Sequence, residues 1–256
     1  MLPNQPQRPE PTAVIACRVI EEELRHLGAG LPHILAFEFF EVGLHDRPNQ
    51  LRTQLQAGIA RCEANPEVSV ILLGYGLCGT ATVGLSPRRC TLVLPRAHDC
   101  VTLFLGSKEK YAACVSREPG TYWYCPGWNR SGRSPGPDRE AALRKEYSEK
   151  FGAEEADYLI ETERTTLAQY TTAAYTSLGM PGDDDQRRYA ERCARSLGWR
   201  FRHCPGDASL LRDLLSGPWS EDRFLVVRPG QAIAHAPDER IATVVPADVK
   251  SPRTVH

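Results

Sequence analysis

The sequence predicts an α/β protein built on a mostly parallel, doubly wound sheet. Short runs rich in Val, Ile and Leu alternate with amphipathic helical segments through the first half of the chain. The run at 68–73 is apolar throughout, which is typical of a strand covered on both faces. Alternation of this kind places helices in the crossover connections between parallel strands.

The first half is predicted as strand, helix, strand, helix, strand, strand and helix. The segments are 13–17, 18–27, 34–40, 48–64, 68–73, 90–94 and 101–114, in that order. Glu21, Glu22 and Glu23 lie near the start of the first helix, where carboxylates interact favourably with the helix dipole. Pro48 suits the first turn of the second helix.

Between residues 119 and 138 the pattern breaks into an aromatic stretch followed by Gly, Ser and Pro, which predicts an exposed functional loop or a hinge. Helices are expected over 139–151, 153–169, 186–197 and 208–215, and strands over 173–177, 199–203 and 224–227. The predicted organisation is a disordered lead-in (1–12), a first α/β half (13–128), a loop or hinge (129–138), a second α/β half (139–247) and a tail (248–256). A cleft is expected between the halves.

Composition narrows the class of protein. A chain of 256 residues with a formal net charge of -1 suits one large domain or two packed halves, and gives no electrostatic case for binding nucleic acid or an anionic membrane. No apolar run has the length of a membrane span, and the Pro-rich start lacks the features of a signal peptide. We therefore expect a cytoplasmic protein with a small-molecule substrate.

The nine cysteines are the most informative part of the composition. An odd number argues against a complete disulfide framework, and in a reducing compartment such thiols are buried, metal-bound or reactive. Cys62 and Cys193 lie in helical patterns and are interpreted as buried side chains.

Thiol and imidazole side chains gather just beyond the predicted strands. These residues are Cys17, His45, Cys78, His98 and Cys100. Because ligands bind outside the carboxyl ends of the strands in open α/β sheets, we expect these side chains to share one edge. The prediction is a zinc or iron site held by Cys17, Cys78, His98 and Cys100, with His45 facing the substrate.

A glycine-rich segment surrounds Cys78. Gly74, Gly76, Gly79 and Gly84 permit close backbone approach and positive φ. We expect this loop to turn Cys78 inward, with Tyr75, Gly76 and Gly79 contacting a small ligand. The segment lacks the glycine patterns of nucleotide-binding loops, and a plain strand-to-loop turn is the alternative interpretation.

His98-Asp99-Cys100 is predicted to open a helix, whose exposed amides would favour a Cys100 thiolate. Zinc held there would activate a substrate thiol. The metal-free alternative has Cys100 as the catalytic nucleophile and His98 or His45 as its base. Residue spacing does not separate the two.

Two further groups have competing interpretations. Asp183-Asp184-Asp185 is interpreted as a helix start, with a hard-cation site as the alternative. Trp123, Tyr124 and Trp128 are interpreted as core, with a ligand pocket as the alternative.

The chain resembles the bacterial and archaeal DUF1638 family of unknown function. The resemblance rests on Ala16-Cys17, Leu44-His45 with Pro48, Gly74 to Gly79, His98-x-Cys100 with Phe104 to Ser107, Pro119 to Thr121, Gly206-Asp207, Leu210-Leu211 and Phe224 to Gly230. It implies no specific reaction. The genomic setting of some members implies a link, by association, to corrinoid-dependent methyltransferase systems and one-carbon or methylated-amine metabolism.

The leading hypothesis is thus a metal-dependent enzyme of small-molecule group transfer, such as methyl transfer to a thiol. A second hypothesis is a non-catalytic accessory protein that delivers or senses a metal or corrinoid for a methyltransferase partner. A third is a metal-free cysteine enzyme acting on an amide or thioester.

Overall fold

The structure is a computed structural model of the chain and describes residues 10–248. Residues 1–9 of the predicted lead-in and 249–256 of the predicted tail lie outside the described part. The predicted α/β class with a mostly parallel central sheet is confirmed. Within residues 10–248, no helix combines the length and the apolar character needed to cross a membrane.

The chain forms two compact units that do not follow the predicted halves. Among the described residues, one unit comprises 10–103 together with 208–248, and the other comprises 104–207. The predicted hinge at 129–138 therefore lies inside the second unit. The first unit is discontinuous because the strands near the C-terminus belong with the N-terminal ones, and the last strand predicted for the second half pairs with the first sheet.

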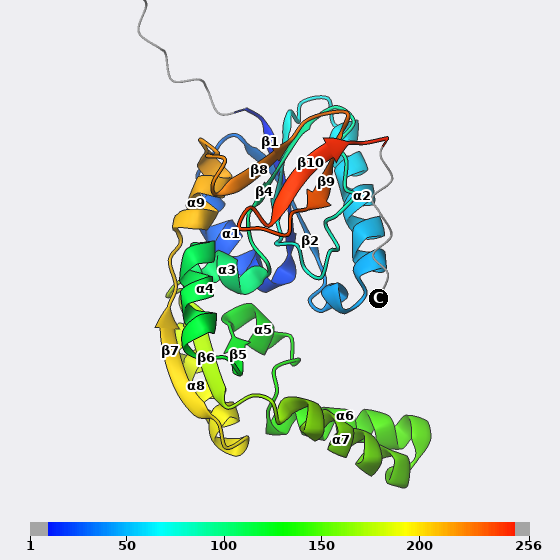
Figure 1. Cartoon of the computed structure of the whole chain (residues 1–256), viewed down its shortest axis with the longest axis vertical. Helices are drawn as coiled ribbons and strands as arrows, with labels where there is room; N and C mark the ends of the chain where they lie inside the picture. The colour runs from blue at the N-terminus through cyan, green and yellow to red at the C-terminus, as the bar shows by residue number, and fades with distance from the viewer. Residues whose placement is uncertain (1–9, 249–256) are drawn as a thin grey trace, which may run out of the picture. The chain divides into compact units, whose positions relative to one another are not determined.

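A five-stranded sheet with the order β2-β1-β3-β4-β8 forms the centre of the first unit (Figure 1). Its strands are β1 (Thr12–Cys17), β2 (Ile34–Phe40), β3 (Val70–Gly74), β4 (Thr91–Pro95) and β8 (Phe224–Val227). The first four are parallel, and β8 runs antiparallel to β4. Every residue of β3 is buried, which explains its uninterrupted apolar sequence.

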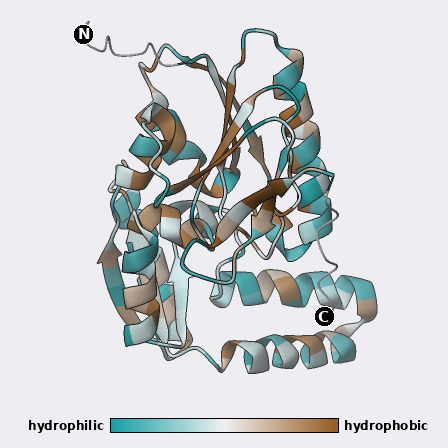
Figure 2. Cartoon of the chain, turned by 45° about the horizontal axis from the view of Figure 1, so that its top comes forward, coloured by the Kyte–Doolittle hydropathy of each residue, from teal (hydrophilic) through white to brown (hydrophobic). Residues whose placement is uncertain are grey.

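Helices and a hairpin cover the two faces of this sheet. On one face, Leu51, Leu55 and Ile59 of α2 (Pro48–Ala64) share a core with Ile15, and so do side chains of the hairpin β9 (Gln231–His235) and β10 (Ala242–Pro246). The opposite face carries α1 (Glu21–Gly28) and α9 (Ser209–Ser216). Figure 2 shows the strands largely brown and the outer surfaces of the helices largely teal. The hairpin was not predicted.

Successive strands are added on one side of β1 and then on the other. The connection from β1 through α1 leads to β2 on one side of β1, and the connection from β2 through α2 leads back to β3 on the other side. A crevice at the carboxyl ends of β1 and β3 follows from this arrangement, and it is where ligands bind in doubly wound sheets.

The second unit has a smaller parallel sheet with the order β5-β6-β7. Its strands are β5 (Thr121–Tyr124), β6 (Thr172–Ser177) and β7 (Arg200–Pro205). The helix α8 (Asp183–Ser196) packs on β6 and β7, and its Cys193 joins a core with Tyr124 and Tyr175. The helical hairpin of α6 (Pro137–Phe151) and α7 (Ala153–Leu167) is inserted between β5 and β6.

Two predicted elements are wrong. The segment 119–138 is not simply a loop, because it contains β5 and the short helix α5 (Pro126–Arg130). The helix predicted over 101–114 is two helices, α3 (Cys100–Leu105) and α4 (Lys108–Arg117). Gly106, with φ +85°, ends the first, and Ser107 caps the second by accepting a hydrogen bond from the backbone N–H of Lys110 at 3.1 Å.

The Arg89 side chain connects the end of α2 to the segment that leads into β3. The Arg89 guanidinium donates hydrogen bonds to the backbone carbonyls of Glu63, Asn65 and Val68 at 2.8 to 3.2 Å. These carbonyls lie at the helix C-terminus and in the turn that leads to β3, where backbone acceptors need partners. Arg89 therefore sets how α2 meets the strand that enters the crevice.

We predict that Arg89→Lys lowers the free energy of unfolding by about 1–3 kcal/mol, because an ammonium group cannot reproduce the fork of guanidinium donors and leaves carbonyls unpaired. Urea denaturation measures the difference. The control is Arg88→Lys, a change at the neighbouring exposed arginine, which we expect to stay within about 0.5 kcal/mol of the unchanged protein. Equal losses from both variants would contradict this role for Arg89.

Candidate functional site

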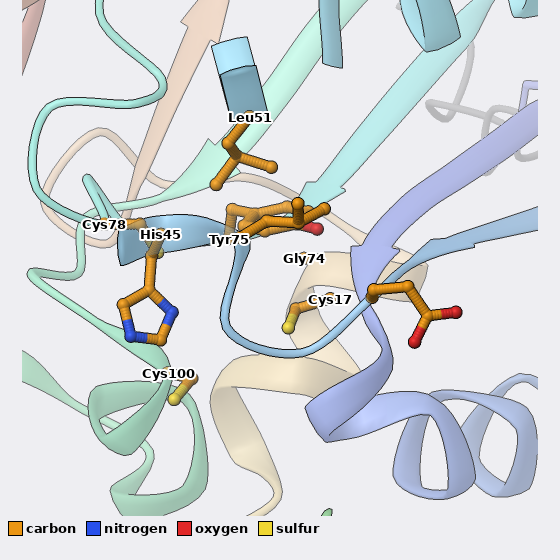
Figure 3. Close-up of a pocket in the computed structure, with 9 residues that line it drawn as sticks. Cys17, His45, Leu51, Gly74, Tyr75, Cys78 and Cys100 are labelled. Carbon is orange, nitrogen blue, oxygen red and sulfur yellow. The ribbon is translucent and has the colours of Figure 1, made fainter. Parts of the chain in front are cut away.

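A small cavity lies at the carboxyl edge of the five-stranded sheet (Figure 3). It is lined by Cys17, Glu41, Leu44, His45, Leu51, Gly74, Tyr75, Cys78 and Cys100. Cys17 is the last residue of β1 and Gly74 is the last residue of β3. These are the neighbouring parallel strands at which the strand order changes side. The space for a water-sized occupant is about 20 Å³, enough for one water molecule or one ion.

Cys17 and Tyr75 form the inner part of the lining. Tyr75 is 3% exposed, and within residues 10–248 its hydroxyl has no nitrogen or oxygen partner. The Cys17 thiol interacts with this hydroxyl. Burial raises the pKa of Cys17 to about 11, against the lowering effect of the Val19 backbone, and burial also raises the pKa of Tyr75. Both groups are therefore protonated at neutral pH.

The segment after β3 is held against the segment after β4 by backbone contact. The Leu77 N–H donates to the Ala97 carbonyl at 2.9 Å, and the Cys78 N–H donates to the His98 carbonyl at 3.0 Å. Gly76 makes this approach possible, since a Cβ at that position would lie 2.7 Å from the Asp99 nitrogen and 2.8 Å from the Ala97 oxygen. The sequence predicts that glycine in this loop permits close backbone approach, and Gly76 is the position where the two segments come that close.

Cys78 has an unusual backbone conformation. Its φ is +46°, and Gly79 and Thr80 follow with φ of +62° and +72°. A left-handed conformation costs a non-glycine residue about 1–2 kcal/mol. Such strain concentrates at functional positions, where the surrounding structure holds it. Burial raises the pKa of the Cys78 thiol to about 12, with the neighbouring Cys17 acting in the same direction.

Cys100 enters the cavity from the start of α3. The Asp99 side chain accepts hydrogen bonds from the N–H groups of Val101 and Thr102, at 3.0 and 3.3 Å, and so caps this helix. The helix begins where the sequence predicts, which fixes the backbone of Cys100. His98 is not among the residues that line the cavity, and its backbone carbonyl holds Cys78 instead.

The rim of the cavity carries His45 and Glu41. His45 lies in a single 3-10 turn (Leu44–Asp46) and its side chain is 45% exposed, with Nε2 3.4 Å from Asp46 Oδ1. Glu41 follows directly after β2 and forms an ion pair with Arg18 at 2.9 Å. Figure 3 shows the His45 ring reaching towards the cavity from this turn. The sequence interpretation missed Glu41 as a lining residue, although it follows a strand just as Cys17 does.

The structure thus brings most of the predicted site residues to one cavity. Cys17, His45, Tyr75, Cys78 and Cys100 line it, and Gly76 and Gly79 shape the loop beside it. As the side chains stand, no three His, Cys, Asp or Glu groups within residues 10–248 are arranged to hold a metal ion. The thiols share a cavity without forming a coordination shell.

A family model described as "protein of unknown function (DUF1638)" matches residues 39–215, which is more than half of the chain. The chain belongs to DUF1638. The matched part of this DUF1638 protein contains His45, Tyr75, Cys78 and Cys100, whereas Cys17 precedes it. No curated protein and no solved structure matches the chain.

The two other predicted groups of this DUF1638 protein lie in its second unit. Asp183 begins α8, and its carboxylate accepts hydrogen bonds from the hydroxyls of Tyr175 and Ser177. Asp184 and Asp185 form ion pairs with arginines one turn further along the helix. Tyr124 is fully buried and donates to the Pro135 carbonyl at 2.8 Å, as a core residue does.

Gly76→Ala tests the contact that positions Cys78. We expect this substitution to lower the free energy of unfolding by about 1–3 kcal/mol, because the added Cβ would clash with backbone atoms of the segment after β4. Chemical denaturation measures the loss. The control is Gly179→Ala, where a Cβ meets nothing within 4 Å and only the φ of +72° costs about 1 kcal/mol. A Gly76→Ala loss no larger than that of the control would contradict the close approach.

The raised thiol pKa values predict a pH profile for alkylation. Only the thiolate reacts, so Cys17 in the native, metal-free protein should react at pH 8 roughly a hundredfold more slowly than in the unfolded chain. Its rate should still climb at pH 10, where the unfolded chain, with an ordinary thiol pKa of 9.0, has levelled off. Peptide mapping after timed iodoacetamide treatment measures both rates. A native plateau below pH 9 would contradict the raised pKa.

Proposed function

We propose that the cavity binds one zinc or iron ion through Cys17, Cys78 and Cys100, with His45 as an exchangeable fourth ligand, and that the protein transfers a group on a small molecule there. The observation that carries the proposal is the convergence of three thiols, each following a different strand, on a space that holds one ion. Thiolate sulfur with one imidazole is a common ligand set for zinc.

The lining fits an ion by its chemistry, and side-chain rotation would complete the fit. Cysteine side chains rotate about the Cα–Cβ bond between staggered positions, so the sulfur atoms can turn inward without moving the backbone that carries them. Cys17 and Cys78 are protonated in the metal-free protein because burial disfavours their thiolates. A divalent cation supplies the charge that offsets this, and its binding would release protons.

The position of His45 favours a site that stays open to substrate. Cys17 is the last residue of β1, and Cys78 is held by its backbone hydrogen bond to His98, whereas His45 lies on a short turn and is 45% exposed. A catalytic metal site keeps one position for water or substrate, while a structural site is closed. The bound ion would supply Lewis acidity or an activated thiolate. Glu41 and His45 would meet the substrate at the rim and could hold or move its proton.

Two alternative functions receive less support. A metal-free cysteine nucleophile needs a stable thiolate, which burial opposes at Cys17 and Cys78. This alternative would therefore rest on Cys100 alone, and it gives no role to the other two thiols of the cavity. A corrinoid is far larger than a cavity with room for one water-sized group. Any link to corrinoid-dependent methyl transfer would therefore run through a partner protein, and this chain would contribute the metal–thiolate chemistry.

The proposal predicts about one equivalent of zinc or iron in protein purified without oxygen, measured by elemental analysis. Cys78→Ser and Cys100→Ser should each weaken metal affinity by more than the roughly 10- to 100-fold that loss of an outer-shell partner costs. The matched control is Cys114→Ser in α4 of the second unit, which should keep full metal content. Cobalt substitution should give sulfur-to-metal charge-transfer absorption that the two site variants lose.

Comparison of the two histidines separates this ligand set from the one that the sequence predicts. His45→Ala should lower metal affinity while His98→Ala leaves it within a few-fold, since the cavity is lined by His45. Metal far below one equivalent that does not respond to Cys78→Ser or Cys100→Ser would overturn the proposal. Metal at full occupancy without turnover of any small molecule would retain the site and favour the accessory function.

A further inference from the structure

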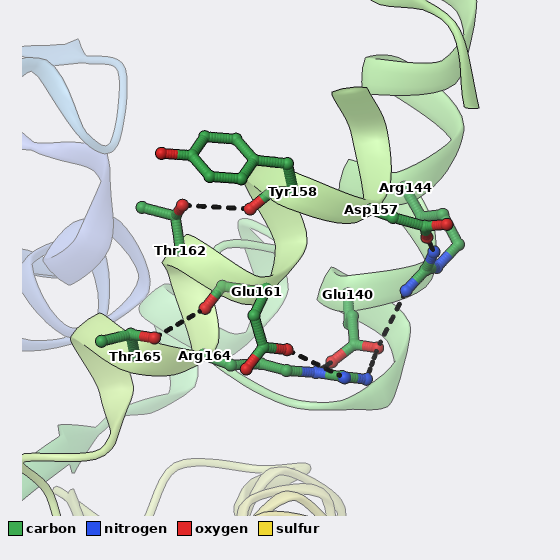
Figure 4. Close-up of polar contacts among 8 residues, drawn as sticks. All are labelled: Glu140, Arg144, Asp157, Tyr158, Glu161, Thr162, Arg164 and Thr165. Atoms are coloured by element: carbon green, nitrogen blue, oxygen red, sulfur yellow. Dashed lines mark hydrogen bonds and ion pairs between the residues drawn. The ribbon is translucent and has the colours of Figure 1, made fainter. Parts of the chain in front are cut away.

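The helical hairpin of α6 and α7 contributes little to the core of its unit. Its buried residues are Leu143, Ala156 and Ile160, and α6 and α7 pack chiefly against each other. Two connections between the helices are ionic. Arg164 donates two hydrogen bonds to the Glu140 carboxylate, at 2.6 and 3.1 Å, and Arg144 pairs with Asp157 (Figure 4). The hairpin is thus a preformed element rather than a loose insertion.

The hairpin also carries the most exposed large apolar side chains of residues 10–248. Tyr158 is 74% exposed and Phe151, at the end of α6, is 56% exposed. In Figure 4 the Tyr158 ring points away from Arg144 and Asp157, the pair that joins the two helices. Tyrosine is enriched at protein interfaces, because its ring is apolar and its hydroxyl can hydrogen-bond to a partner or to water.

Carboxylates surround Tyr158 along the helix. Glu154 lies four residues before Tyr158, Glu155 lies three before it, and Glu161 lies three after it. At these spacings all three are neighbours of Tyr158 on one face of the helix. The whole of α7 has five carboxylates and one arginine, whereas α6 has equal numbers of acidic and basic side chains. We call Glu154, Glu155, Tyr158 and Glu161 the acidic face of α7.

Helix stability accounts for part of this pattern only. Glu154 and Glu155 lie in the first turn of α7, where the helix dipole favours them. Glu161 lies beyond that turn and forms an ion pair with Arg164 at 3.6 Å, in which the two side chains stay 70% and 55% exposed. An exposed pair of this kind contributes little to stability and leaves the carboxylate accessible to another molecule. An exposed tyrosine between these carboxylates gains nothing from the dipole. The combination fits a surface that is completed by another molecule.

We propose that the acidic face of α7 is a docking site for a partner protein that presents lysine or arginine side chains around an apolar pocket. The phenol of Tyr158 would enter the pocket, and the basic side chains would meet the carboxylates and the face of the ring. This inference is independent of the cavity in the first unit.

Charge complementarity selects this occupant over the others. A second copy docked through the same face would oppose two acidic helices, since an isologous contact brings the same patch together from both chains. Nucleic acids and anionic membranes are negative, and the face would repel them. Basic protein surfaces gain attraction and a faster encounter from such a face.

The test replaces Tyr158 with the photoreactive amino acid p-benzoylphenylalanine in the full-length chain, expressed in its native host. Illumination followed by mass spectrometry identifies the cross-linked protein, which is then purified for titration against the unmodified chain. We expect binding that weakens as salt rises. Tyr158→Ala and Glu161→Lys should each weaken it about tenfold or more, as loss of an interface anchor does.

The matched control is Glu149→Lys, a change of the same charge on α6 of the same hairpin, which should leave the affinity unchanged. Circular dichroism and urea denaturation verify that each variant is folded. Cross-linking to a second copy of the chain, absence of any cross-link at position 158, or binding that is insensitive to salt would each overturn the proposal.

Discussion

The candidate site depends on the backbone pairing between the segments that follow β3 and β4. Leu77 and Cys78 donate to the carbonyls of Ala97 and His98, and Gly76 leaves room for this approach. Without it, Cys78 and Cys100 would follow two strands with no fixed relation between their side chains. The pairing also stabilises the left-handed conformation of Cys78, since the hydrogen bond to His98 and the buried position of the loop offset a strain of about 1–2 kcal/mol.

The protonation of the thiols explains why they share a cavity without being arranged as metal ligands. Burial favours the neutral forms of Cys17 and Cys78, and each thiolate would raise the pKa of the other. Without a nearby cation, these two side chains are therefore most stable with protons on sulfur. The proposed cation would reverse this preference, because it would be attracted by both thiolates at once and would offset the repulsion between them. Proton release and side-chain closure would then be one coupled event.

Most of the fold and much of the site were predictable because both follow from periodicity. Uninterrupted apolar runs reveal buried parallel strands, and Cys17 and Cys78 are recognisable because they follow such runs. The presence of His45 was predicted, but the absence of His98 from the lining was not, since it depends on which way the backbone turns after β4. The strand at 121–124 was missed because its pairing with β6, rather than a local pattern, stabilises it. The split at Gly106 has a local signal that the sequence interpretation overlooked, a glycine with positive φ followed by a serine cap. The hairpin β9–β10 was missed because its strands are only five residues long and their short apolar runs do not by themselves predict strands.

The position of β1 bears on how much of the chain the family fold requires. The DUF1638 match begins at residue 39, yet β1 lies between β2 and β3 and is hydrogen-bonded to both. A chain that began at residue 39 would lose β1 and all of β2 except Phe39 and Phe40, and with them Cys17, the partner of the Tyr75 hydroxyl. The segment from Thr12 to Cys17 is thus as necessary to the crevice as the matched residues are. The structural domain therefore extends beyond the matched range at its N-terminal end, and the thiol most deeply anchored in the sheet comes from that extension.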